Sequence, residues 1–309
     1  MRFIPESTNI DFLGRRKLAL ILSILVMIVC AGSLLLRGMN LGLDFTGGTV
    51  LEVSYPTAVD IGNVREALSA AGFNDAQAQH FGTASEILIR IAPREGLNTA
   101  DISTKALNAL QTADSEVQMR RVEFVGPQVG DELVEDGGLA MLYALIGILI
   151  YIWLRFEWRL AVGTIAATIH DVVFTIGVFS IFQLDFDLTV LASVLAVIGY
   201  SVNDTVVVLD RIRENFRKMR KGSPVEVMNA SINQTLSRTL MTSLTTLLAV
   251  IILFVFGGPA VHNFALALII GIVVGTYSSI YIASAVALML GLSREDLLPR
   301  AKEEADDRP

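Results

Sequence analysis

Two polar residues inside a long apolar run constrain this chain more than any other feature of its sequence. The run extends from Leu188 to Leu209 and contains Asn203 and Asp204 near its end. A run of this length can cross a bilayer as a helix, which takes about 20 apolar residues. A charge inside such a helix costs roughly 2.5–3.5 kcal/mol, and ionisable residues in membrane spans mark ion or proton paths. The run therefore predicts a membrane helix that buries an acid for a reason other than helix formation.

Six apolar runs of spanning length predict a polytopic α-helical membrane protein. Hydrophobic residues make up 53% of the 309 residues, and the mean hydropathy is +0.58, which excludes an ordinary soluble domain. The predicted transmembrane helices cover residues 18–36, 136–155, 160–182, 188–209, 239–256 and 264–290. The single cysteine, Cys30, lies in the first of them, so a disulfide within the chain is excluded.

Charged residues are separated along the chain in a way that predicts its orientation in the membrane. The region Gly38–Glu135 holds 14 acidic and 6 basic residues, whereas Asp210–Gly222 holds 2 acidic and 6 basic ones. Positive charge accumulates on the cytoplasmic side of membrane proteins. The pattern therefore sets topology and does not indicate a nucleic-acid partner. The segments predicted to be cytoplasmic are residues 1–17, 210–238 and 291–309, and the segment predicted to be periplasmic is residues 37–135.

The cytoplasmic loop at residues 210–238 is predicted to contain an amphipathic helix. Ser223 and Pro224 are a typical helix start, with a capping hydroxyl followed by proline in the first turn. Apolar residues then recur at spacings of three, four and four between Val225 and Leu236. This pattern predicts a helix that lies on the inner membrane surface before the fifth span.

The periplasmic segment has the pattern of a small α+β domain. Alternating apolar residues predict strands, and apolar residues at helical spacing predict helices. The order along the chain is strand Thr49–Tyr55, helix Asp60–Ala71, strands Ala76–Phe81 and Glu86–Ile91, helix Thr99–Thr112, and strand Val117–Val125. This βαββαβ order is the ferredoxin-like arrangement, which hosts many functions and indicates none. The glycine-rich segment Asp44–Gly48 is predicted to be a tight turn into the first strand.

Asp204 is the first candidate for a functional role. Tyr200 and Ser201 lie about one helical turn before it, so both are predicted to hydrogen-bond its carboxyl group, and Asn203 adjoins it. One interpretation is a proton or ion site, and the other is a buried polar residue that only holds helices together. Arg238 lies at the cytoplasmic edge of the fifth span at a similar depth. It is a partner for Asp204 or, alternatively, an anchor at the membrane interface.

His170 and Asp171 form a second ionisable pair inside a predicted span. Adjacent helical residues point about 100° apart, so the two are not expected to face one partner. We expect one to bind a neighbouring helix and the other to face a cavity, and a relay role and a structural role stay equally open. No residue pattern indicates a catalytic group, a metal site, a cofactor or a nucleotide, so the sequence predicts no enzymatic activity.

Several segments together resemble a known family. They are Gly42–Gly48, Val125–Leu133, His170–Asp171, Gly199–Asn215, Gln234–Thr239, Thr242–Ser243 and Gly275–Tyr281. Their composition and order resemble the SecD/SecF family of bacterial protein-export membrane proteins, and the resemblance extends over residues 15–291. The SecF branch of this family resembles one half of a transporter of the resistance-nodulation-division superfamily.

The resemblance implies a function that the residues alone do not give. It implies an inner-membrane subunit that pairs with SecD and uses the proton motive force to help unfolded preproteins leave the SecYEG channel, with YajC as a further partner. It also implies that Asp204 and Arg238 are the proton-coupling acid and base. Without the resemblance, the residues indicate an ion-coupled membrane protein with one external domain. A small-molecule efflux transporter of the same superfamily and a passive membrane scaffold are the alternatives.

Overall fold

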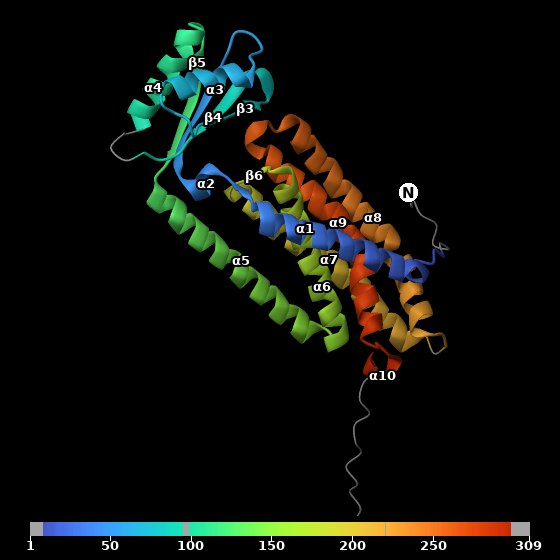
Figure 1. The fold of residues 1–309 in the computed structure, drawn as a ribbon. Helices are drawn as coiled ribbons and strands as arrows, with labels where there is room; N and C mark the ends of the chain where they lie inside the picture. Colours follow the sequence, from blue (N-terminus) through green and yellow to red (C-terminus); the bar gives the residue numbers. More distant parts are fainter. Residues whose placement is uncertain (1–8, 95–98, 220, 298–309) are drawn as a thin grey trace, which may run out of the picture.

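Long helices dominate the computed structural model of the chain (Figure 1). The structure describes residues 9–94, 99–219 and 221–297. Within these residues, the six helices that are long and apolar enough to cross a membrane are α1 (Arg16–Arg37), α5 (Pro127–Arg155), α6 (Trp158–Phe182), α7 (Leu188–Lys218), α8 (Pro224–Phe256) and α9 (Pro259–Met289). The predicted helical membrane protein with a small separate sheet domain is therefore confirmed at this level.

The six helices form an inner and an outer set. In the most apolar windows of α6, α7 and α9, 44%, 50% and 56% of the residues are buried, against 11%, 11% and 17% in α1, α5 and α8. The inner helices pack on one another, and α1 and α8 lie against them, while α5 runs along one side of the bundle (Figure 1). Large apolar side chains such as Leu36, Leu154 and Phe256 are exposed on the outer helices. This apolar exterior fits a surrounding of lipid.

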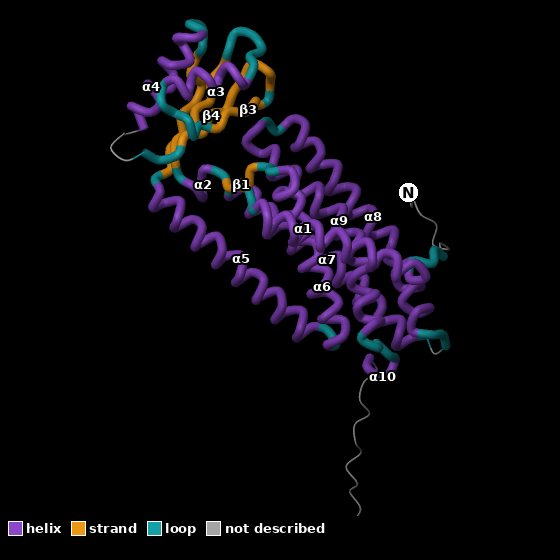
Figure 2. Tube along the Cα trace, in the orientation of Figure 1, coloured by secondary structure: helices purple, strands orange, loops and turns teal. Residues whose placement is uncertain are grey.

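A small sheet domain lies at one end of the bundle (Figure 2). Its elements in chain order are β2 (Gly48–Ser54), α3 (Ile61–Ala70), β3 (Gln77–Phe81), β4 (Thr83–Ile91), α4 (Thr99–Ala113) and β5 (Gln118–Val125). The strands are antiparallel in the spatial order β3-β4-β2-β5. Every strand and helix predicted in this region is present, with boundaries that differ by at most three residues.

The core of the sheet domain lies between one face of the sheet and the helices α3 and α4. Leu51 and Val53 of β2 alternate with polar residues and are fully buried, as are Ile87 and Ile89 of β4. Phe73, in the turn after α3, is 1% exposed and packs into the same cluster. The opposite face of the sheet carries Glu52 and Arg90 and points toward the bundle. The domain therefore has one apolar face and one polar face, as the alternation of its strands requires.

The segment between α1 and the sheet domain departs from the predicted tight turn. It forms β1 (Asn40–Leu41) and the one-turn helix α2 (Leu43–Thr46), and only then do Gly47 and Gly48 turn the chain into β2. Both glycines have positive φ, and a Cβ on Gly48 would lie 2.6 Å from the carbonyl oxygen of Ile91. Glycine is needed here because other residues avoid this conformation and this contact.

The first part of α8 corrects the predicted surface helix. Ser223 caps the helix in a complete capping box with Glu226, so the predicted start is present. The helix then continues without a break to Phe256, and Met228 and Ile232 are buried in the bundle core. The apolar face that sequence periodicity assigned to a membrane surface is therefore covered by protein. Periodicity reveals that a face is buried, but it does not identify what buries it.

The helix ends opposite the sheet domain are joined by ion pairs. Arg155, at the end of α5, donates two hydrogen bonds of 2.7 Å to Asp210 of α7. Arg159 pairs with Asp296 in the short helix α10 (Arg294–Leu297). Burial alone would raise the pKa of Asp296, but hydrogen bonds from Ser293 and Arg159 outweigh it and hold the pKa below its usual value. The predicted tail therefore starts as an anchored turn, and the rest of it, residues 298–309, lies outside the described residues, as do residues 1–8 of the predicted N-terminal segment.

Candidate functional site

Asp204 lies inside the bundle, where three helices meet. It is on α7, is 6% exposed, and accepts hydrogen bonds of 2.8 Å from Thr239 of α8 and 2.8 Å from Ser279 of α9. Both donors are themselves buried. Each carboxyl oxygen thus has one hydroxyl partner on a different neighbouring helix. The carboxyl group holds α7, α8 and α9 together at one point, and its protonation state decides which of these hydrogen bonds it accepts.

The predicted partners of Asp204 on its own helix were wrong. Ser201 donates to Asp171 of α6, and Tyr200 donates to Ser243 of α8 at 3.3 Å. Asn203 is exposed on the outer side of α7. Side chains one turn apart share a face, but in a packed bundle hydroxyls from neighbouring helices compete for the same carboxyl. Sequence spacing along one helix gives no information about donors on neighbouring helices.

Arg238 stands on α8 directly before Thr239, the residue that donates to Asp204. Its side chain is exposed, and its charge is close enough to act on Asp204 electrostatically. Within the described residues, no acid lies within ion-pair distance of the Arg238 guanidinium. Asp204 and Arg238 are therefore neighbours without a direct bond, and Arg238 remains accessible to another acid.

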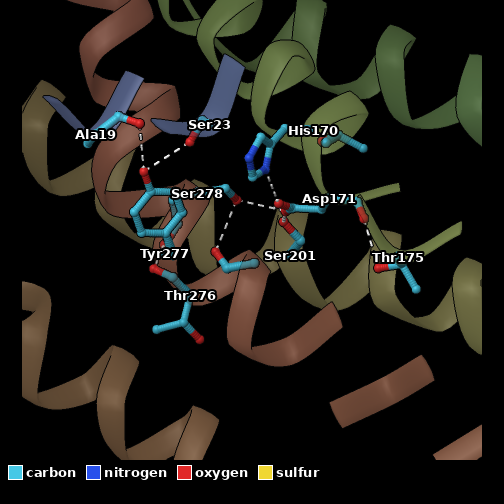
Figure 3. A network of polar contacts seen from close by, with 12 residues as sticks. Ala19, Ser23, His170, Asp171, Thr175, Ser201, Thr276, Tyr277 and Ser278 are labelled. Atoms are coloured by element: carbon cyan, nitrogen blue, oxygen red, sulfur yellow. Dashed lines mark hydrogen bonds and ion pairs between the residues drawn. The ribbon is translucent and has the colours of Figure 1, made fainter. Parts of the chain in front are cut away.

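His170 and Asp171 form a direct contact inside the bundle (Figure 3). His170 Nδ1 lies 3.0 Å from Asp171 Oδ1, and the two side chains are 7% and 1% exposed. Asp171 Oδ2 also accepts hydrogen bonds from Ser201 of α7 and Ser278 of α9. As expected for one member of the pair, Asp171 binds neighbouring helices; His170 does not face a separate partner, because its imidazole folds back onto the neighbouring carboxyl group. Both are buried, and α6 is fixed to α7 and α9 through them.

Several of these partners were not singled out from the sequence. Thr239, Ser278 and Ser279 appear in the motifs as small residues of the kind that lets helices approach closely. In the structure, their hydroxyl groups point at the two buried carboxyl groups. The only signal was the clustering of hydroxyl residues on α9. Among the described residues, no group of three or more His, Cys, Asp or Glu side chains is arranged to hold a metal ion.

A second polar region lies between the sheet domain and the bundle. A cleft of about 800 Å³ is lined by the polar face of the sheet and by the outer ends of α7, α8 and α9. Asp185, in the two-residue strand β6 (Asp185–Phe186), is at the centre of the polar contacts there: it accepts hydrogen bonds from Gln79 and Arg90 of the sheet and from Asn40 of β1. Asp185 was not among the candidate residues that the sequence indicated. It joins the domain to the bundle.

The start of α7 is also tied to the segment that precedes the sheet domain. Asp44 of α2 accepts a hydrogen bond of 3.0 Å from the backbone N–H of Leu188, the first residue of α7. Asp187 caps the same helix end by accepting from Val190 N–H. The helix that carries Asp204 is thus connected at its outer end to both β6 and the sheet domain.

Two family models match the chain. The model described as protein export membrane protein SecD/SecF, C-terminal, matches residues 105–293, and the SecD/SecF GG motif matches residues 32–59. Among curated relatives, the protein translocase subunit SecF of Vibrio alginolyticus is 52% identical and covers 100% of this chain and 99% of its own length. The corresponding subunit of Pseudomonas aeruginosa is 48% identical and covers 97% and 98%.

Solved structures give the same relationship. The crystal structure of SecDF from Thermus thermophilus, described as a translocon-associated membrane protein, has a TM-score of 0.85 and 36% identity over 93% of this chain. A structure of SecDF in a super-membrane-facing form has a TM-score of 0.70 at 36% identity over 94% of this chain. In both cases the chain spans 39% of the length of the SecDF chain.

Proposed function

The chain belongs to the SecD/SecF family of protein-export membrane proteins, and from that membership we propose that it uses the proton motive force to assist preprotein translocation. It acts as a subunit beside SecD. The 39% coverage of the SecDF chains supports this pairing, because SecD would supply the remainder of such an assembly. The SecYEG channel is the partner from which unfolded preproteins emerge, with YajC as a further partner, and the chain catalyses no covalent chemistry on them.

The observation that carries the proposal is the position of Asp204. A carboxyl group buried among three helices is a costly feature, at roughly 2.5–3.5 kcal/mol for a charge. A proton that crosses a potential of about 100 mV releases about 2.3 kcal/mol, which is of the same size. Protonation of Asp204 can therefore be driven by the gradient, and Arg238, exposed beside it, sets the local potential.

Proton binding at Asp204 can be converted into motion through its two hydroxyl partners. The charged carboxylate accepts from Thr239 and Ser279, whereas the protonated acid gains a donor and loses accepting capacity. The two protonation states therefore favour different contacts of α7 with α8 and α9. Packed helices switch between discrete arrangements rather than deform continuously. Leu188 of α7 donates to Asp44, and β6, which directly precedes α7, carries Asp185, the acceptor of the bond from Arg90 of the sheet, so a change in α7 packing can reach the sheet domain.

The orientation in the membrane follows from the charges at the helix ends. Both termini and the loop at residues 210–238 are cytoplasmic, and the sheet domain is periplasmic. The basic residues Arg155, Arg159 and Arg217 at the end opposite the sheet domain support this orientation. Cysteines introduced at Ser69 and Ser223, with Cys30 replaced by Ala, should react with an impermeant reagent from opposite sides of the membrane. Labelling of both from one side would contradict it.

The sheet domain is assigned to the ferredoxin-like class. The strand order β3-β4-β2-β5 and the βαββαβ sequence of elements support this assignment. We propose that the domain contacts emerging polypeptide without sequence preference and moves with the bundle. The polar cleft of about 800 Å³ beside it and the absence, among its described residues, of a group arranged for metal binding support a binding role.

The test replaces Asp204 by Asn, which has the shape of the protonated acid and cannot release a proton. Asp204→Asn should assemble with SecD at the wild-type level but lose the component of preprotein export that an uncoupler removes. Arg238→Met should have the same effect, and Arg238→Lys should retain part of the activity because it keeps the charge. Export into inverted membrane vesicles, measured with and without the uncoupler, gives the result.

Thr205→Val is the matched control for this test. Thr205 adjoins Asp204, is 1% exposed, and its hydroxyl has no hydrogen-bond partner among the described residues. Its replacement should leave gradient-dependent export unchanged. If Asp204→Asn keeps wild-type uncoupler sensitivity, Asp204 is a structural contact and the proton-coupling proposal is rejected.

A further inference from the structure

The His170–Asp171 pair is more completely enclosed than a helix-packing contact requires. Asp171 is 0% exposed, and its carboxyl group has three side-chain partners: His170 on its own helix, Ser201 on α7 and Ser278 on α9 (Figure 3). The His170 ring lies between Phe174 and Tyr277, at 6.2 Å from each ring centroid. A titratable imidazole and a titratable carboxyl therefore share one buried site at which a proton can reside on either group.

This site is joined to Asp204 by the same two helices. On α9, the consecutive residues Ser278 and Ser279 donate to Asp171 and Asp204, at 2.7 Å and 2.8 Å. On α7, Ser201 donates to Asp171 and lies three residues before Asp204. α9 thus presents one hydroxyl to each carboxyl group, and α7 carries Asp204 and presents one hydroxyl to Asp171. A shift of α9 that changes one hydrogen bond changes the other, since the two serines are adjacent in the chain.

The two serine hydroxyls have alternative acceptors. Ser278 Oγ lies 3.2 Å from the carbonyl oxygen of Gly275, and Ser279 Oγ lies 3.0 Å from that of Thr276. A hydroxyl has one proton, so each serine donates either to a carboxyl group or to its own helix. When a carboxylate is protonated, its serine is free to turn back to the helix carbonyl, a contact that bends helices. The charge on either carboxyl thus alters the same turn of α9.

The other titratable groups around the pair are few in the described part of the chain. Tyr277 on α9 lies beside the His170 ring, Asp204 on α7 is connected to the pair through the adjacent serines of α9, and Arg238 on α8 acts on Asp204. On α1, Ser23 hydrogen-bonds Tyr277, which lies beside the His170 ring. Cys30, also on α1, packs against Gly177 further along α6.

We infer that His170 and Asp171 form a second protonation centre, coupled to Asp204 through the adjacent hydroxyls of Ser278 and Ser279. The inference rests on the proposed function, because it gives the proton cycle two linked sites in place of one. A proton that binds at one centre changes the hydrogen bonds of α9 and thereby the proton affinity of the other. A purely structural contact would hold the helices together without such coupling.

The test measures each carboxyl group directly. Infrared difference spectra of the full chain with its SecD partner, recorded as pH changes, report the carboxyl C=O bands. Asp171→Asn should remove one titrating band, and it should move the titration midpoint of the Asp204 band, identified by its loss in Asp204→Asn, by about one pH unit, the interaction typical of coupled sites. His170→Gln, which retains a donor but does not titrate, should also shift that midpoint, and it serves if Asp171→Asn fails to assemble.

The coupling is tested with serine variants. Ser278→Ala together with Ser279→Ala should abolish the effect of Asp171→Asn on the Asp204 midpoint. Ser284→Ala is the matched control, since Ser284 is a fully buried hydroxyl on α9 with no hydrogen-bond partner in the structure. It should leave both midpoints unchanged.

The outcomes separate this inference from the proposed function. If neither Asp171→Asn nor His170→Gln moves the Asp204 midpoint, the second centre is rejected, while the loss of gradient-driven export in Asp204→Asn would still stand. If Asp204→Asn leaves export uncoupler-sensitive but the two midpoints remain coupled, the proposed function fails and the linked titration is retained as a property of the bundle.

Discussion

The interiors of the sheet domain and the helix bundle differ in one respect: the bundle buries histidine and aspartate side chains within its apolar core, and the sheet domain does not, among the described residues. In the sheet domain, the buried cluster is apolar, and Thr49 and Ser103 are its buried polar residues. In the bundle, large apolar residues cover the outer helices, whereas His170, Asp171 and Asp204 are buried. Water drives apolar groups together in a soluble domain, but lipid does not, so membrane helices associate through close packing and polar contacts.

This difference indicates which region of the molecule can hold buried groups that bind and release protons. A soluble core excludes polar groups because each buried one costs free energy, and the domain is stable for that reason. A membrane bundle can use polar groups as helix contacts, and such contacts change when a proton binds. The domain is therefore suited to move as a rigid unit, and the bundle to change its packing. The following predictions test this contrast.

The largest expected effect is on the core of the sheet domain. Phe73→Ala should lower the free energy of unfolding of the domain by about 3–5 kcal/mol, because a large side chain that is 1% exposed leaves a cavity. Leu154→Ala, on the outer helix α5, should have almost no effect, since Leu154 is 80% exposed. Hydrogen exchange of the full chain in detergent would measure both. Equal losses for the two variants would show that apolar residues stabilise both regions in the same way.

A smaller effect is expected for hydroxyl groups within the bundle. Thr239→Val should lower the free energy of unfolding of the bundle in detergent by about 0.5–2 kcal/mol, because it leaves one oxygen of Asp204 without its donor. Thr205→Val changes the same atoms at an equally buried position whose hydroxyl has no partner, so it should be neutral or stabilising. The contrast between interiors would be weakened if the two variants were equally stable, since the polar contacts would then contribute nothing.

The smallest expected effect concerns pH. Burial, with the negative charge of Asp114, raises the pKa of Tyr55 in the sheet domain to about 12. An unfolded chain releases this proton near pH 10. The stabilisation is therefore complete below about pH 10 and is lost as the pH rises toward 12. In urea unfolding of the full chain, Tyr55→Phe should remove this part of the alkaline decline. An unchanged decline would show that Tyr55 is solvated.

The secondary structure was largely predictable from the sequence. Alternation at Thr49–Tyr55 predicted β2, and the apolar runs predicted the long helices, because each pattern reflects burial on one face or exposure to lipid. The amphipathic face of α8 was also correctly read as buried. The sequence did not identify what covers this face, because a hydrophobic face packs equally well on a membrane surface or on another helix.

The sequence identified the candidate residues but not the hydrogen bonds that connect them. Asp204, Arg238, His170 and Asp171 stood out because ionisable groups are rare in apolar runs. Their partners were misassigned where the sequence offered only neighbours on the same helix. The donors to Asp204 come from 35 and 75 residues further along the chain.

The sequence by itself determined that this chain crosses a membrane, carries one α+β domain apart from its membrane helices, and buries a small number of charges, because hydropathy, periodicity and charge act locally along the chain. The tertiary structure alone decided which hydroxyl meets which carboxyl. Those contacts depend on the rotation and depth of each helix relative to its neighbours, and helix packing sets both. Ser278 and Ser279, adjacent in sequence, reach two different acids only because α9 lies between Asp171 of α6 and Asp204 of α7.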